Sequence, residues 1–141
     1  EFGSKLARKN LQCSLKRWPD SAPIECDTNK IQRVFANLLS NIERYAPDGD
    51  RIDCEFHACK GGYRIKLVNA APALKRDDIN NLFERFYRAD LSRNSQGSGL
   101  GLSIVKQLVE LHGGRVGADY HDNRLSIWFQ LPRENFNFLT T

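Results

Sequence analysis

The sequence predicts an α+β domain, a two-layer α/β sandwich in which helices cover one face of a mixed, mostly antiparallel sheet. Three observations lead to this fold class. Several segments alternate apolar and polar residues with the period of a half-buried strand, and most of them occur in hairpin-like pairs. Longer segments instead carry apolar residues at helical spacing. The order along the chain is strands, helix, hairpin, short helix, glycine-rich loop, helix and hairpin.

Length and composition are those of one ordinary globular domain. The chain has 141 residues, of which 40% are hydrophobic and 27% are charged. It contains no apolar run near the roughly 20 residues of a membrane span. The net charge of +4 comes from scattered basic residues, so nucleic acid is not an expected partner. We expect residues 1–6 to be a cloning remnant, residues 7–132 to form the domain, and residues 133–141 to be a peripheral tail.

The four cysteines are expected to be free thiols in a reducing cytosol. Cys54, His57 and Cys59 suggest zinc as an alternative. On a strand, however, Cys54 and Cys59 lie on opposite faces, which disfavours a shared metal. A disulfide is equally disfavoured.

The first half of the chain is predicted to form an edge strand and a long helix. Residues 11–17 alternate in polarity, and residues 22–26 are expected to form a second short strand. Asp27-Thr28 then provides the N-cap of a helix over residues 28–46. The apolar residues of this helix recur at three- and four-residue intervals, which makes one continuous buried stripe. They are Ile31, Val34, Phe35, Leu38, Leu39 and Ile42.

A second row of residues on this helix is polar. Asn37, Asn41 and Arg44 lie roughly a quarter-turn from the apolar stripe, at about 100° per residue. The simplest interpretation is a solvated helix flank, although these side chains sit at the rim of the buried face.

The remaining regular elements are two hairpins and two helices. Residues 51–59 and 63–67 alternate around a Gly-Gly pair, which predicts an antiparallel hairpin. A second hairpin is predicted around residues 121–123. Residues 77–86 and 100–111 are predicted to be helices, and the second ends at a His-Gly-Gly sequence. We expect this histidine to interact with the helix dipole rather than to act as a catalyst.

A glycine-rich loop precedes the last helix, with Gly97, Gly99 and Gly101 at every second position. Such a loop at a helix start presents unpaired N–H groups and the positive end of the helix dipole, which suit a phosphate. Arg88 and neighbouring arginines are available for charge-assisted contacts to phosphate oxygens. A flexible surface loop is the alternative. A Rossmann loop is disfavoured because it needs a strand directly before the first glycine, and here a polar loop precedes Gly97. A P-loop is disfavoured because it needs Gly-Lys-Ser/Thr, and here Leu102 follows Gly101.

Several motifs resemble those of the ATP-binding domain of bacterial sensor histidine kinases. FERFYR resembles the F box of that family, GSGLGLSIV and ELHGG resemble its second glycine box, and NLLSNIERYAP resembles its N box. The resemblance covers residues 11–132. It implies the Bergerat ATP-binding fold of the GHKL superfamily, with ATP and Mg²⁺ as ligands.

The resemblance implies roles for individual residues. Asn41 matches the asparagine that holds Mg²⁺, while Arg44 and Tyr45 match the residues that frame the phosphates. The family usually has Lys where this chain has Arg44, so the charge is kept and the geometry differs. Arg88 and the glycine-rich lid are implied to bind the triphosphate. The lid residues implied to contact nucleotide are Gly97, Gly99, Leu100 and Gly101.

The first glycine box departs most from the family pattern, which is Asp-x-Gly-x-Gly-Ile. Asn69 stands in place of the aspartate that accepts the adenine amino proton, and Leu74 is expected to contact the base. An amide oxygen accepts the same hydrogen bond, but without a charge it should hold the base less firmly. Ala71 and Ala73 replace both glycines, and we expect their methyl groups to narrow the adenine pocket.

The implied activity is transfer of the ATP γ-phosphoryl group to a histidine, which makes the chain part of a protein-histidine kinase. ATP-hydrolysing members of the superfamily have a glutamate one helical turn before the metal-binding asparagine. Asn37 occupies that position here and cannot act as a general base. Arg88, Arg44 and Asn37 are the candidate catalytic residues, and catalysis would consist of positioning and charge neutralisation.

The resemblance also implies partners and a location. The acceptor histidine is expected on a separate dimerisation domain outside this chain, because His57, His112 and His121 lack a suitable helical context. A response regulator is the expected partner of the full-length protein, and the isolated domain is expected to be monomeric. The domain should be cytoplasmic and part of a membrane-anchored sensor. The alternative is a degenerate nucleotide-sensing or pseudokinase module that binds ATP weakly.

Overall fold

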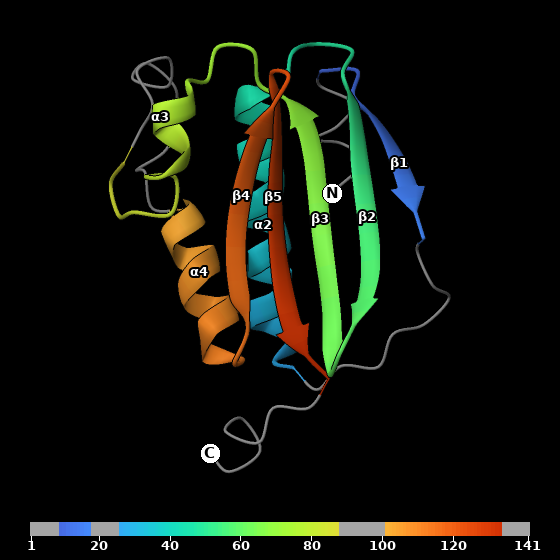
Figure 1. The fold of residues 1–141 in the computed structure, drawn as a ribbon, viewed down its shortest axis with the longest axis vertical. Coiled ribbons are helices and arrows are strands. Elements are labelled where there is room, and N and C mark those ends of the chain that lie inside the picture. Colours follow the sequence, from blue (N-terminus) through green and yellow to red (C-terminus); the bar gives the residue numbers. More distant parts are fainter. Residues whose placement is uncertain (1–8, 18–25, 88–100, 134–141) are drawn as a thin grey trace.

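The computed structural model describes residues 9–17, 26–87 and 101–133. Strands and helices follow one another in the predicted order (Figure 1). The elements are β1 (Gln12–Lys16), α2 (Thr28–Tyr45), β2 (Arg51–Cys59), β3 (Gly62–Ala70), α3 (Arg76–Ile79), α4 (Gly101–Leu111), β4 (Arg115–His121) and β5 (Arg124–Pro132). Nearly all of the short strand expected over residues 22–26 lies outside the described residues.

The strands form one mixed sheet in the order β1-β2-β3-β5-β4. β1 pairs with β2 in parallel, and the other neighbouring strands are antiparallel. In Figure 1, α2 passes behind the sheet and α4 lies near the β4 edge. A close approach fixes one residue of the β3–β5 pair, because a Cβ built at Gly62 would lie 2.1 Å from Leu131 O. The predicted fold class, a two-layer α+β sandwich, is confirmed.

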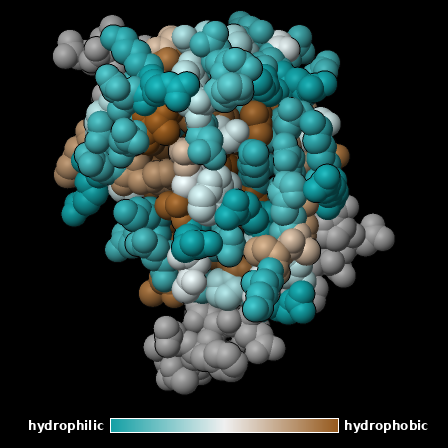
Figure 2. All heavy atoms as spheres, in the orientation of Figure 1, coloured by the Kyte–Doolittle hydropathy of each residue, from teal (hydrophilic) through white to brown (hydrophobic). Residues whose placement is uncertain are grey.

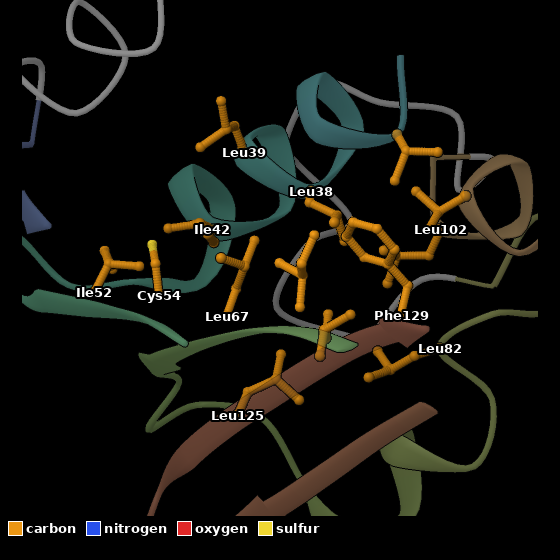
Figure 3. Close-up of a cluster of buried hydrophobic side chains, with 14 of the residues drawn as sticks. Leu38, Leu39, Ile42, Ile52, Cys54, Leu67, Leu82, Leu102, Leu125 and Phe129 are labelled. Atoms are coloured by element: carbon orange, nitrogen blue, oxygen red, sulfur yellow. The ribbon is translucent and has the colours of Figure 1, made fainter. Parts of the chain in front are cut away.

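The apolar stripe of α2 forms the centre of the core. Val34 and Leu38 are 0% and 1% exposed, and Ile42 is 3% exposed. Figure 3 shows Leu38 and Ile42 facing side chains of the sheet such as Phe129. Burying each side chain of this size contributes about 1.5–3 kcal/mol, so this stripe holds the helix against the sheet.

The start of α2 is capped twice. Asp27 Oδ1 accepts the Lys30 N–H at 3.1 Å, as expected for an N-cap, and the hydrogen bonds to Lys30 lower the pKa of Asp27. His112, 1% exposed, accepts the Asp27 N–H at Nε2 over 2.9 Å. Its Nδ1 lies 2.8 Å from Leu108 O in the last turn of α4. The expected contact of His112 with its own helix end is therefore present, and a link to α2 is added.

The helix expected over residues 77–86 is wrong in extent. Only α3 is helical, and turns continue from there to Phe86. Asn80 and Asn81 follow α3, and asparagine is a poor helix former. Phe86 has a φ of 65° and is 63% exposed, so it does not join the buried face to which Leu82 belongs.

All four cysteines are free. Cys54 is buried, and burial is the main cause that raises the pKa of its thiol. Its Sγ lies 3.0 Å from Cys13 Sγ on the edge strand, a contact that the sequence did not predict. Within the described ranges, no group of three His, Cys, Asp or Glu residues could hold a metal ion.

Among the described residues, no helix covers the opposite face of the sheet, which is largely hydrophilic (Figure 2). On this face the Arg64 guanidinium stacks on Trp128, 4.1 Å from the ring centroid. Trp128 covers Gly117, where an added Cβ would lie 2.2 Å from the indole. No helix in the described part of the chain is long and apolar enough to cross a membrane.

Candidate nucleotide-binding site

The polar row of α2 borders the layer between the helices and the sheet. Asn41 is 6% exposed and Asn37 is half-buried. The Nδ2 atoms of both amides are buried and have no hydrogen-bond partner among the described residues. Leaving such a group unpaired costs about 1–3 kcal/mol, so an unpaired amide in a native protein calls for a ligand or water that completes it. The pair argues against a solvated flank and supports a binding site.

The same amides meet the chemical requirement for a hard metal ion. Each side chain carries one carbonyl oxygen, and Mg²⁺ favours oxygen ligands together with phosphates and water. An amide that turns its oxygen to a metal leaves its N–H₂ group to donate to phosphate oxygens. The residues present therefore fit Mg²⁺ with a polyphosphate.

Arg44 and Tyr45 lie in the last turn of α2, and both are half-buried. Nearby, the Tyr87 hydroxyl donates to Asp78 Oδ1 in a short hydrogen bond. This bond, with smaller effects of burial and of neighbours including Tyr45, raises the pKa of Tyr87 to about 12. This bond joins Tyr87, the last described residue before residues 88–100, to Asp78 of α3.

The departure from the first glycine box lies at the end of β3. Asn69 is 1% exposed, and its Nδ2 donates to Ala70 O at 2.9 Å, which leaves Oδ1 as the acceptor. Leu74 is 4% exposed. Ala71 is buried and Ala73 is exposed. Of the two methyl groups expected to narrow the pocket, only that of Ala71 lies in the interior.

Sequence analysis missed the residues that hold this segment in place. Asp50 Oδ2 accepts the Ala70 N–H at 2.8 Å, and Arg124 Nη1 lies 3.5 Å from Asp50 Oδ1. The Tyr120 hydroxyl lies 2.7 Å from Ala71 O. Asp50 looks like an ordinary turn residue and Tyr120 like one more alternating strand residue. Only the register of three strands brings them to the same place.

The remaining expected residues surround the start of α4. Gly101 is exposed as the first residue of α4, and a Cβ built there would meet no atom within 4 Å. The helix start is therefore open among the described residues, as anion binding requires. Arg88, Gly97, Gly99 and Leu100 lie outside the described residues, so their expected roles stay predictions.

Comparison with known proteins accounts for this arrangement. A sequence model of the histidine kinase-, DNA gyrase B-, and HSP90-like ATPases matches residues 26–135. The chain belongs to this family. As a member of this ATPase family it shares the sheet and helices described above with solved histidine kinase domains. The catalytic domain of the histidine kinase ThkA superposes with a TM-score of 0.81 at 23% identity, covering 96% of this chain and 88% of that chain.

Sequence relatives narrow the comparison to sensor kinases. The chain is 35% identical over 136 residues to the signal transduction histidine-protein kinase BaeS of Escherichia coli (strain K12), covering 94% of this chain and 29% of BaeS. It is 34% identical over 134 residues to the sensor protein VanS of Enterococcus faecium, covering 94% and 34%. The mycobacterial sensor histidine kinase MprB superposes with a TM-score of 0.75 at 26% identity, covering 95% and 94%. The chain thus spans about a third of the length of these curated relatives.

Proposed function

We propose that this chain is the ATP-binding catalytic domain of a two-component sensor histidine kinase. It binds Mg²⁺–ATP and transfers the γ-phosphoryl group to a histidine on a separate dimerisation domain. The observation that carries the proposal is the pair of buried amide nitrogens on α2, Asn37 Nδ2 and Asn41 Nδ2, which have no hydrogen-bond partner among the described residues. They lie beside the core of a fold shared with histidine kinase catalytic domains.

The base end of the proposed site consists of Asn69 and Leu74. Asn69 Oδ1 accepts the hydrogen bond of the adenine amino group, because Nδ2 is already used by Ala70 O. Leu74 gives the base an apolar contact. A neutral amide in place of a carboxylate predicts modest affinity, about 6 kcal/mol or less, which corresponds to a Kd of tens of micromolar or weaker.

At the phosphate end, Asn41 holds Mg²⁺, while Arg44 and Tyr45 frame the phosphates. The metal ion, when bound, neutralises part of the phosphate charge. Lid residues Arg88, Gly97, Gly99, Leu100 and Gly101 supply a cation and backbone N–H groups for the triphosphate. Arg44 and Arg88 then stabilise the charge that develops on the γ-phosphoryl group during transfer.

Asn37 favours transfer over hydrolysis. Hydrolysis needs a group that removes a proton from water, and an amide has no basic site for this. Asn37 instead donates from its unpaired Nδ2 and helps to position the phosphates. A histidine imidazole is a nucleophile in its own right, so transfer to histidine needs no such base.

The partners follow from the same assignment. The acceptor is the histidine-bearing dimerisation domain of the same kinase, and a response regulator takes the phosphoryl group from it. The chain itself is a monomeric, cytoplasmic part of a membrane-anchored sensor. Sensor kinase names among the sequence relatives support this placement.

Titration calorimetry with and without Mg²⁺ tests the proposal. We expect Mg²⁺-dependent ATP binding and, with the histidine-bearing domain supplied in trans, transfer of radiolabelled γ-phosphate to that domain. Binding without transfer would favour the degenerate nucleotide-sensing module, for which the altered first glycine box is the supporting observation. If millimolar nucleotide leaves the melting temperature and the NMR spectrum unchanged, the kinase assignment fails.

A further inference from the structure

The segment between β3 and α3 keeps its shape without glycine. Residues 71–74 read Ala-Pro-Ala-Leu. Within the described ranges, neither Ala71 nor Ala73 is among the residues with positive φ. Any L-residue can adopt this backbone conformation, so the conformation does not depend on glycine. Contacts with other parts of the chain must therefore select it.

The β4–β5 hairpin supplies these contacts. Asn123 O accepts the Ala71 N–H at 2.8 Å. The Tyr120 hydroxyl lies 2.7 Å from Ala71 O and 3.1 Å from Leu74 O, so one phenolic proton serves two carbonyl groups. The Leu74 N–H also donates to Ala71 O at 3.1 Å, which closes a turn. Tyr120 therefore holds a turn together at the point where its two ends meet.

The sheet register explains why Tyr120 reaches this turn. Leu125 of β5 pairs with Asn69 of β3 on one side and with Tyr120 of β4 on the other. Residues directly opposite one another share a face of the sheet, so Tyr120 and Asn69 lie on the same face, two strands apart. The hairpin turn at Asp122 and Asn123 has positive φ at both residues, 52° and 63°, as tight hairpins prefer. Figure 1 shows this hairpin tip beside the end of β3.

We propose that Tyr120 is a positioning residue that fixes the adenine end of the nucleotide site. This role rests on the proposed function, in which Asn69 and Leu74 bind the base. Asn69 lies in β3 two residues before the turn and Leu74 ends it, so the Tyr120 hydroxyl sets the position of one relative to the other. The phosphate end belongs to α2 and α4, to which no described hydrogen bond of Tyr120 leads. The effect of Tyr120 is thus confined to the base.

The test compares Tyr120→Phe, which removes only the hydroxyl, with Tyr63→Phe as a matched control. Tyr63 is also a half-buried strand tyrosine, but it packs against Phe56 at the other end of the sheet. The ligands are Mg²⁺–ATP and the base-free probe Mg²⁺–tripolyphosphate, titrated by NMR. We expect Tyr120→Phe to weaken ATP binding about tenfold and tripolyphosphate binding less than about twofold, with no change in Tyr63→Phe. Equal losses for both ligands, or an unchanged affinity for ATP, would overturn the role.

Two further measurements separate a positioning role from simple stabilisation. In the nucleotide-free protein, Tyr120→Phe should shift the amide resonances of Ala71 and Leu74, and unshifted resonances would overturn the role. Tyr120→4-aminophenylalanine restores a donor in the same place and should recover ATP affinity to within about twofold of wild type. Failure of this rescue, or a Tyr120→Phe variant that does not fold, would show that Tyr120 matters for packing alone.

The wild-type titration distinguishes the two proposals. If wild type binds ATP but the Tyr120 variants behave like the control, only the positioning role is lost and the proposed function stands. If wild type does not bind ATP, the proposed function fails and the role of Tyr120 in nucleotide binding fails with it.

Discussion

Two residues one turn apart on α2 are both buried but differ in whether the side chain has a polar group without a partner. Leu38 and Asn41 are both almost fully buried, at 1% and 6% exposure. Leu38 packs in the hydrophobic core and has no polar side-chain group that needs a hydrogen-bond partner. Asn41 has a buried amide N–H₂ without a partner among the described residues, and such an unpaired group is unfavourable for the folded protein. Burial alone therefore does not distinguish a core residue from a site residue here.

Paired substitutions on α2 test this distinction. Leu38→Ala should lower the free energy of unfolding by about 2–5 kcal/mol, because it leaves a cavity in the core. Asn41→Ala should leave stability nearly unchanged, since it removes an unsatisfied group, and should weaken Mg²⁺-dependent nucleotide binding. Urea denaturation and calorimetry measure the two effects. The reverse pattern would mean that Asn41 supports the fold rather than the site.

The first glycine box allows a gain-of-affinity test. Asn69→Asp combined with Ala71→Gly and Ala73→Gly should tighten ATP binding, because a carboxylate accepts the adenine amino proton more strongly than an amide does. The single variant Ala73→Gly serves as the control, since Ala73 is exposed and should contribute little. Affinity that is unchanged or weaker in the triple variant would show that the pocket is adapted to Asn and Ala.

The phenol of Tyr87 should titrate at high pH. Its hydrogen bond to Asp78 raises the pKa of Tyr87 to about 12 in the folded protein, above an unfolded value of about 10. The resulting stabilisation is fully present below pH 10 and is lost as the pH rises through 12. Ultraviolet absorbance titration should show a late phenol transition that Asp78→Ala moves to lower pH. A late transition that survives in Tyr87→Phe would belong to another tyrosine.

At the scale of the elements, α2 and α4 depend on one another through a single ring. His112 follows α4, and its Nε2 accepts a hydrogen bond from the N–H of Asp27, the N-cap of α2. Its Nδ1 contacts Leu108 O in the last turn of α4. Both ring nitrogens have a partner when the ring is neutral with the proton on Nδ1. His112 thus links the N-terminal end of α2 to the C-terminal end of α4.

Removing this ring should loosen the pair of helices. His112→Ala leaves the partly buried Asp27 N–H without its partner, so we expect a loss of about 1–3 kcal/mol in unfolding free energy. His121→Ala is the control, because the side chain of His121 is 85% exposed, and it should change stability by less than about 0.5 kcal/mol. Urea denaturation of both variants gives the comparison. Equal stability of the two would show that the His112 link contributes nothing.

Local patterns predicted most of the elements, and long-range register accounts for what they missed. The six-residue stripe predicted α2, and alternation predicted both hairpins, because these signals lie within single segments. The prediction of a helix over residues 77–86 was wrong because apolar spacing does not require a helix. Ile79 packs against the core from the end of α3, whereas Leu82 reaches the core from a turn. Tyr120 could not be foreseen as a partner of Ala71, since the contact spans 49 residues and three strands. Motifs led to predictions for the site residues, which stay predictions, whereas the residues that support the first glycine box carry no motif and were not predicted.

In the whole molecule, the residues proposed to bind nucleotide come from both layers. Asn69 lies near the end of β3, and Leu74 follows that strand. Asn41 and Arg44 belong to α2, and α4 begins at Gly101. A ligand that contacts all of these elements binds the folded state alone, because the unfolded chain cannot bring them together. Such a ligand should stabilise the entire domain against unfolding, and not merely the loop that contacts it.

Thermal unfolding measures this coupling. Mg²⁺–ATP at about 100 times its Kd should add about 2.7 kcal/mol of stability and raise the melting temperature by roughly 8 °C. Removing Mg²⁺ with a chelator should abolish most of the shift, because Asn41 then has no metal through which to hold the phosphates. Asn41→Ala should show the small, chelator-insensitive shift that the base contacts alone provide. A full shift in this variant, still sensitive to chelator, would place the metal ion on other residues and would leave the unpaired amide of Asn41 without its proposed ligand.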